Sequence, residues 1–289
     1  MKSESEIEQL QNELNQLRKE NLALNNNLFE LNRKLRDSEQ LKSHFISNIT
    51  NEIVNPFTGI MALAGNIKKL KDGEITLAKR MADLIYEEAS HLDFQLRNIF
   101  AVASIEAGIE RLNYSKVKLL SAVSDLEKMF GYLLTKRRLT FSVRFIPDDE
   151  YWSGVEMITD YGKLMMILGN IINNAIKFSP EDSFVDLMIE YHGRSFKFVV
   201  SDRGKGIEPS DRKVIFDRFK QLDEKINSIN TGHGLGLSIV LAFTEMMDGK
   251  VEISGNVHGG TNVTVIFPEQ QIADFDDLED FIVDPDSLF

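Results

Sequence analysis

Apolar residues recur at heptad spacing through the first part of the chain. Leucine or isoleucine alternates between two positions of a seven-residue repeat over residues 5–38, which is the pattern of a coiled-coil seam. Asn21 interrupts one of these positions, and a polar residue there commonly fixes the register and favours two strands. We therefore predict a coiled coil over residues 1–39 rather than a lone surface helix, and expect a sensory segment upstream or a partner that supplies the signal. The repeat positions are Ile7, Leu14, Leu28 and Leu35 in one set and Leu10, Leu17, Leu24 and Leu31 in the other.

Helical periodicity continues over residues 40–70 and resumes over 75–107. The run Lys71-Asp72-Gly73 separates the two segments, and glycine in such a place breaks a helix. Two long helices joined by a short turn form an antiparallel hairpin, and two copies of a hairpin form a four-helix bundle. We therefore predict a dimerisation hairpin over residues 40–112 and a homodimer.

Helical and strand patterns are mixed over residues 113–268, which we predict to be a single domain. A helix is expected near 119–136 and a second one around 164–178. A layer of helices on a mixed sheet is the arrangement that buries such elements. The fold class is therefore α+β: a coiled coil, a helical hairpin and a two-layer α/β sandwich. The strands are expected at 139–145, 157–159, 185–191, 196–201, 250–254 and 262–267.

The helix that ends at Phe178 has an unusual polar face. Its apolar residues recur at helical spacing, yet it contains three asparagines within five residues, although asparagine is a poor helix former. Asn170 and Asn174 are one turn apart, and Lys177 follows on the same side. Amide oxygens and an ammonium group on one face suit Mg²⁺ together with nucleotide phosphates, because Mg²⁺ prefers hard oxygen ligands. A solvated, asparagine-rich face is the alternative.

Two glycine clusters follow this helix. Asp202-Arg-Gly204-Lys-Gly206 comes directly after a strand pattern, so a carboxylate stands beside backbone that can approach a flat base closely. Gly232-His-Gly234-Leu-Gly236 leads into a helix, and a glycine loop at a helix N-terminus offers N–H groups to phosphate. Each cluster alone is weak evidence, but the order of the asparagine helix and the two clusters is specific.

These motifs resemble the core of a sensor histidine kinase. The resemblance covers about residues 40–268 and includes an ATP-binding domain of the type shared with type II topoisomerases, Hsp90 and mismatch-repair ATPases, known as the GHKL or Bergerat type. It implies ATP and Mg²⁺ as cofactors. The aromatic pair in Ile-Phe-Asp-Arg-Phe matches the pair that anchors the ATP lid of kinases, and it favours the kinase branch.

The resemblance also implies a role for each matching residue. Asn174 would hold Mg²⁺ with Asn170 beside it, and Lys177 would reach the phosphates. Asp202 would bind the adenine amine. The other positions carried over are Gly204 and Gly206 at the base, Phe216 and Phe219 at the lid, and Gly232, Gly234 and Gly236 over the phosphates.

The phosphate-accepting histidine of that family is missing. The family pattern is Phe-x-x-x-x-Ser-His-Glu-x-Arg-Thr-Pro-Leu, whereas this chain has Asn51 at the histidine position, followed by Glu52, and Val54 at the arginine position. An amide nitrogen is not a usable nucleophile, because its lone pair is delocalised. We therefore predict that position 51 does not accept phosphate. The departure at Val54 favours natural divergence over a single engineered change.

The residues that remain at this place suggest a different activity. Glu52 and Asn55 keep the acid-x-x-Asn pattern that the family links to dephosphorylation of a response regulator. Asn55 lies one turn after position 51, where its amide can orient a water in line with a phospho-aspartate. An exposed polar stripe without function is the alternative. His44 lies on the same stripe and is the one substitute acceptor we consider.

Composition narrows the remaining possibilities. The chain has a formal net charge of −12, no cysteine and no run of apolar residues long enough to span a membrane. An acidic chain does not suit nucleic acid, and we expect a cytoplasmic location without membrane contact, as part of a longer or membrane-anchored sensor where one is attached. Residues 269–289 form a tail with eight acidic residues and no basic ones, which is either disordered or a docking segment for a basic partner.

Three functions remain open. The first is a degenerate kinase that binds Mg-ATP and controls a response regulator as a phosphatase or by nucleotide-dependent conformation. The second is a scaffold without catalysis that dimerises with an intact partner kinase. The third is an ordinary kinase inactivated by substitution of its acceptor. Intact Asn174, Asp202 and glycine motifs argue against a decaying nucleotide site.

Overall fold

The computed structural model describes most of the chain, in two units that divide after Thr50. The described residues are 16–36 apart from 20, 23, 34 and 35, then 53–147 apart from 72, then 152, 154–216 apart from 213, 235–257 and 259–270. Of the residues predicted above to form the site, Asn51, Glu52, Phe219, Gly232 and Gly234 lie outside these ranges, as do His44 and residues 271–289.

The first unit is helical wherever it is described, from Gln16 to Arg36. The seam leucines that the structure describes, Leu17, Leu24, Leu28 and Leu31, are at least half exposed, from 50% at Leu28 to 64% at Leu31. One helix cannot bury its own apolar stripe, so such a stripe needs a partner helix. The coiled coil itself remains a prediction.

The second unit begins with two helices at the place where the hairpin is predicted. A helix covers residues 53–67, and α2 (Ile75–Glu106) follows a turn in which Gly73 has a φ of +98°. Phe94, Ala101 and Val102 are the buried residues of α2, whereas Phe100 is 66% exposed. A bundle interior needs the helices of a second chain, so the four-helix bundle remains a prediction.

The rest of this unit is an α+β domain with a mixed sheet. The five strands of the sheet are ordered β2-β4-β5-β7-β6, with β2 and β4 parallel and the other pairs antiparallel. A separate pair consists of β1 (Ser115–Lys118) and β3 (Glu156–Thr159). The strands of the sheet are β2 (Thr140–Ile146), β4 (Phe184–Tyr191), β5 (Ser195–Ser201), β6 (Lys250–Gly255) and β7 (Thr261–Pro268).

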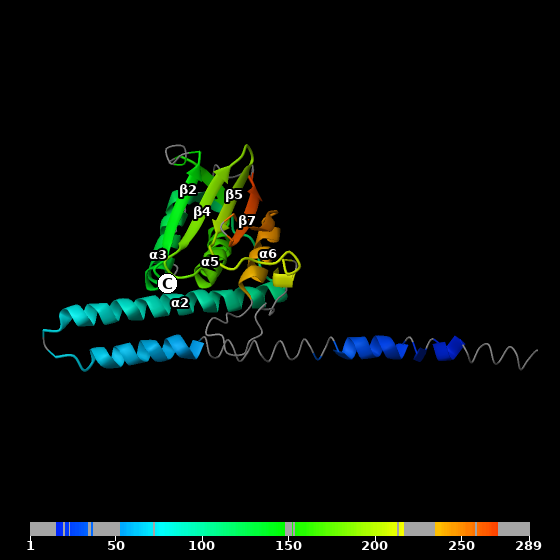
Figure 1. Ribbon diagram of the computed structural model, residues 1–289, viewed down its shortest axis with the longest axis horizontal. Helices are drawn as coiled ribbons and strands as arrows, with labels where there is room; N and C mark the ends of the chain where they lie inside the picture. Colours follow the sequence, from blue (N-terminus) through cyan, green and yellow to red (C-terminus); the bar gives the residue numbers. More distant parts are fainter. Residues whose placement is uncertain are drawn as a thin grey trace, which may run out of the picture. The chain divides into compact units, whose positions relative to one another are not determined.

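Three helices cover one face of this sheet (Figure 1): α3 (Leu119–Lys136), α5 (Tyr161–Phe178) and α6 (Gly236–Met246). Alternate strand residues point toward them and are buried, which is the pattern of a sheet with one covered face. The predicted α+β class, the N-terminal helical region and the order of helices and strands in the sandwich are confirmed. The buried apolar residues that follow this alternation in β4, β5 and β7 are Val185, Leu187, Ile189, Phe196, Phe198, Val200, Val263, Val265 and Phe267.

The central helix α5 begins and ends where its sequence requires. The carboxylate of Asp160 accepts a hydrogen bond from the Lys163 amide (3.0 Å), which caps the first turn. Ser179 takes an extended conformation, as residues before proline do, and so ends the helix. Buried apolar side chains line the sheet-facing side of α5, so its position in the domain is fixed by the core. Among the described residues, none of the helices has both the length and the apolar character needed to cross a lipid bilayer.

The packing between α6 and the sheet predicts opposite effects of two glycine-to-alanine substitutions. A Cβ on Gly249 would lie 2.7 Å from the carbonyl oxygen of Ile266, whereas a Cβ on Gly131, inside α3, would meet nothing within 4 Å. We expect Gly249→Ala to lower the free energy of unfolding by about 1–3 kcal/mol through overpacking. Gly131→Ala should raise it by about 0.5–1 kcal/mol. Urea denaturation of both variants tests this, and equal stabilities would contradict the packing described for Gly249.

Candidate nucleotide-binding site

A buried carboxylate stands at the end of β5. Asp202 is 8% exposed, and its Oδ1 accepts hydrogen bonds from the backbone N–H groups of Gly204 (2.7 Å) and Thr261 (3.1 Å). Burial raises the pKa of Asp202 above its ordinary value, and the hydrogen bonds from Gly204 and from the amide and hydroxyl of Thr261 oppose this shift. The side chain is therefore held in one place at some electrostatic cost.

The glycines around this carboxylate leave no room for side chains. A Cβ on Gly204 would lie 2.8 Å from the carbonyl oxygen of Phe178, and one on Gly260 would lie 2.1 Å from that of Asp202. Gly206 has a φ of +75°, in the left-handed region that glycine tolerates. The backbone therefore closes tightly around Asp202, as expected for a cradle that a flat base can approach.

Asn170 is buried and fully engaged, with an exposed fraction of 4%. Its amide nitrogen donates to Oδ1 of Asn98 on α2 (2.8 Å) and to the carbonyl of Met166 (2.8 Å). Its oxygen accepts from the amide of Asn98 (3.1 Å) and lies 2.9 Å from where a Cβ on Gly236 would be. The side chain of Asn170 thus connects α2, α5 and the start of α6.

The two other polar residues of this helix face lie further along, in the last turns of α5. The side chains of Asn174 and Lys177 are both half-buried. The ammonium of Lys177 lies 5.3 Å from the centre of the Phe178 ring, and this ring is 50% exposed. An amide oxygen at Asn174 has the chemistry of a Mg²⁺ ligand, and Lys177 is one turn away from it.

The start of α6 is the described part of the glycine loop. The helix begins at Gly236, and the side chain of its N-cap residue Leu235 makes no capping hydrogen bond. The first N–H groups of any helix point out of its N-terminal end, which suits phosphate. Phe216 is half-buried in a short 3₁₀ helix, Val214–Phe216, which contacts α6. Asn55 is exposed on the helix over residues 53–67.

Sequence reasoning missed four residues that shape the site. Asn98 holds Asn170, while Asn256 donates to the carbonyl of Asp202 (2.6 Å) and accepts from the amide of Gly260 (3.2 Å). Thr261 completes the shell of the carboxylate. The run Gly-Gly-Thr before the last strand was a usable signal for Gly260 and Thr261, but the pairing of Asn98 with Asn170 has no signal in one sequence.

Comparison with known proteins assigns part of the chain to an ATPase family. Residues 159–271 match the family described as histidine kinase-, DNA gyrase B-, and HSP90-like ATPase. The chain is 30% identical over 249 residues to hybrid signal transduction histidine kinase D of Dictyostelium discoideum, covering 84% of this chain and 16% of that protein. It is 28% identical over 266 residues to the circadian input-output histidine kinase CikA of Synechococcus elongatus, covering 89% and 35%.

A third relative and a solved structure agree with this. The autoinducer 2 sensor kinase/phosphatase LuxQ of Vibrio harveyi is 27% identical over 241 residues, covering 82% of this chain and 27% of LuxQ. The crystal structure of full-length ShkA in complex with AMPPNP has the same fold, with a TM-score of 0.54, 23% identity, and coverage of 81% of this chain and 46% of ShkA. The chain thus spans 16–35% of the length of these curated relatives. Residues 159–271 therefore form an ATPase domain of this family, in a chain that is similar over more than four fifths of its length to proteins named histidine kinases.

Proposed function

We propose that the chain binds Mg-ATP and takes part in two-component signalling without phosphorylating itself at position 51. The observation that carries the ATP site is the buried carboxylate of Asp202 in its glycine cradle. A carboxylate has roughly four acceptor positions, and two amides and one hydroxyl of the protein use three of them. The remaining capacity suits the exocyclic amine of adenine.

The residues around Asp202 fit the rest of a nucleotide. Phe178 offers a half-exposed aromatic surface, and its carbonyl abuts Gly204. Asn174 would hold Mg²⁺, which screens the phosphate charges when bound, and Lys177 would contact the phosphates. The N-terminus of α6 and the glycines that lead into it would close over the phosphates, with Phe216 and Phe219 anchoring the lid. Asn170, whose amide is already engaged, would position its neighbours rather than touch the metal.

The missing acceptor sets the mode of action. With Asn51 in the place of the histidine, the chain has no imidazole to receive a phosphoryl group there. We therefore infer a degenerate kinase, acting as a homodimer on the receiver domain of a response regulator. Dimerisation is supported by apolar side chains exposed on the two helices of the hairpin region, which are Val54, Phe57, Met61, Ile75, Leu77, Tyr86 and Phe100.

Phosphatase action is the specific form we favour. Asn55 is exposed on its helix, as a residue that meets a partner must be. A relative of this chain is named a sensor kinase/phosphatase, so both activities occur among similar proteins. Glu52, which precedes Asn55 by three positions, would assist it. A scaffold that pairs with an intact kinase is the second candidate, and the same exposed apolar residues favour it.

Replacing Asp202 by asparagine separates binding from stability. Asparagine can keep the hydrogen bonds from Gly204 and Thr261 but presents an N–H group where the amine of adenine must donate. We expect Asp202→Asn to weaken ATP binding by about 10–100-fold, measured by calorimetry with Mg²⁺. Asp182→Asn, which alters an exposed carboxylate, should leave affinity within about twofold.

Although Asp202→Asn should weaken ATP binding, it should not lower the free energy of unfolding at pH 7. Because burial raises the folded-state pKa of Asp202 above its ordinary 3.8, the folded protein holds this proton more tightly, and its stability falls as pH rises through that window. Asp202→Asn should therefore be at least as stable as the parent at pH 7, with the difference shrinking as pH falls. A variant that binds ATP normally would contradict the assigned role of Asp202.

The acceptor hypothesis is tested with γ-labelled ATP. We expect no stable label on the parent protein and label on Asn51→His, because only the imidazole supplies a nucleophile at this position. The labelled residue is identified by mass spectrometry of peptides kept at alkaline pH, where phosphohistidine survives. Label on the parent at His44 would show that the acceptor has moved and that the protein is an active kinase.

The phosphatase hypothesis is tested with a phosphorylated receiver domain. We expect the parent protein to speed loss of the phosphoryl group and Asn55→Ala to remove most of this effect, by about 10²-fold or more, because the amide that orients the water is gone. Thr58→Ala, about one helical turn after Asn55 and also exposed, is the matched control and should stay active. Equal rates with and without the parent protein would favour the scaffold instead.

A further inference from the structure

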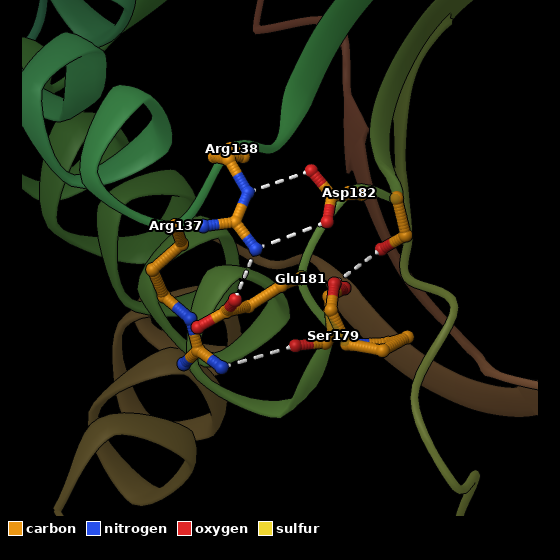
Figure 2. Close-up of polar contacts among 7 residues, drawn as sticks. Arg137, Arg138, Ser179, Glu181 and Asp182 are labelled. Atoms are coloured by element: carbon orange, nitrogen blue, oxygen red, sulfur yellow. Dashed lines mark hydrogen bonds and ion pairs between the residues drawn. The ribbon is translucent and has the colours of Figure 1, made fainter.

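Two adjacent arginines follow the end of α3 and make different contacts (Figure 2). Arg138 is exposed and contacts two carboxylates, with 2.7 Å from its Nε to Oδ1 of Asp182 and a further contact to Glu181. Hydrogen bonds from Arg138 lower the pKa of Asp182. Arg137 is half-buried, and its guanidinium donates to the backbone carbonyls of Lys177 (2.7 Å) and Ser179 (3.2 Å).

The contacts of Arg137 stabilise the C-terminus of α5. The last carbonyls of a helix have no intrahelical partners and carry the negative end of its dipole. Ser179 is 1% exposed, so water has little access to this end of the helix. A guanidinium satisfies two carbonyls at once through its planar fork. Arg137 thus fixes the chain on both sides of Phe178, across 40 residues of sequence.

This end of α5 forms one wall of the Asp202 cradle. The carbonyl oxygen of Phe178 stands 2.8 Å from where a Cβ on Gly204 would be, so the two backbones are in close contact. The hydroxyl of Ser179 accepts from the amide of Arg203 (3.4 Å). The next amide, that of Gly204, donates to the carboxylate of Asp202 (2.7 Å). A continuous series of contacts therefore leads from Arg137 to the carboxylate.

We propose that Arg137 is a positioning residue for the adenine side of the nucleotide site. It holds the backbone of residues 177–179 against the segment 203–204, and so sets the place and direction of the Asp202 carboxylate. It touches neither nucleotide nor metal. The inference rests on the proposed function, since it presupposes that Asp202 recognises the adenine amine.

Arg138 provides a matched control in the same turn. It has the same charge and lies next to Arg137, but its partners are exposed carboxylates. Exposed ion pairs of this kind contribute little to the free energy of folding. If the general positive charge of this turn mattered for the nucleotide, both arginines would be needed. If the fork on the carbonyls matters, only Arg137 is needed.

The experiment compares Arg137→Ala, Arg137→Lys and Arg138→Ala with the parent in the full chain. Isothermal titration at low temperature with Mg²⁺ gives the Kd and the number of sites for ATP and for ITP, which has a carbonyl in place of the exocyclic amine. The ratio of the two affinities reports the contact with Asp202, because changes at Lys177 affect both nucleotides alike. We expect Arg137→Ala to bind ATP about tenfold more weakly, with one site per chain and a reduced preference for ATP over ITP.

The other variants and outcomes decide between explanations. Arg137→Lys should fall between the parent and Arg137→Ala in its preference, because an ammonium lacks the fork, and it decides the question if Arg137→Ala does not fold. Arg138→Ala should bind like the parent. A lower number of sites with unchanged Kd and preference would mean that Arg137 acts on folding alone and would overturn the inference. No binding of ATP by the parent would overturn the proposed function, and this inference with it.

Discussion

A carboxylate that is removed from water at the end of a strand must be surrounded by donors, or it loses its charge. At Asp202 these donors are two backbone amides and the hydroxyl of Thr261, and backbone can come so close only where side chains are absent. The glycine at 204 and the glycine at 260 follow from this requirement, since a Cβ at either place would collide with a carbonyl oxygen. The need to satisfy one buried charge thus brings three segments together: the end of β5, the end of α5 and the turn before β7.

A second buried polar group extends this arrangement to the helix outside the domain. The amides of Asn98 and Asn170 donate to each other, and a buried amide pair is stable only when both partners stay in register. Phe94, one turn before Asn98, packs beside it: its ring lies 2.9 Å from where a Cβ on Gly169 would be and meets Phe130 edge-on at 6.0 Å. The position of α2 therefore affects the packing of α5, the helix that carries Asn174 and Lys177. A shift of α2 would leave the amide of Asn170 on α5 without its partner.

The sequence was sufficient for those features that depend on local periodicity. The alternation in β4 and β5 and the 3.6-residue spacing in α5 reflect which side of each element meets the core, so these elements are found close to their predicted limits. The glycine motif after β5 was also readable, because few conformations need two glycines beside a carboxylate. The hydrogen-bond partners of Asp202 and of the end of α5 could not be predicted from the sequence. Asn256 stands in a turn, where asparagine is common for other reasons, and Arg137 reaches carbonyls 40 residues away, which no spacing rule encodes.

The physical cost of Asp202 itself supports a ligand at this place. An asparagine could accept the same two backbone hydrogen bonds without the desolvation that raises the pKa of the buried carboxylate. A structure that needed only to close this turn would gain from that change. A carboxylate is favoured over an amide when a donor outside the protein has to be recognised, and strained electrostatics of this kind gather at functional sites. The asparagine at position 51 therefore does not imply a decayed domain, because Asp202 remains a costly group that closing this turn alone does not require.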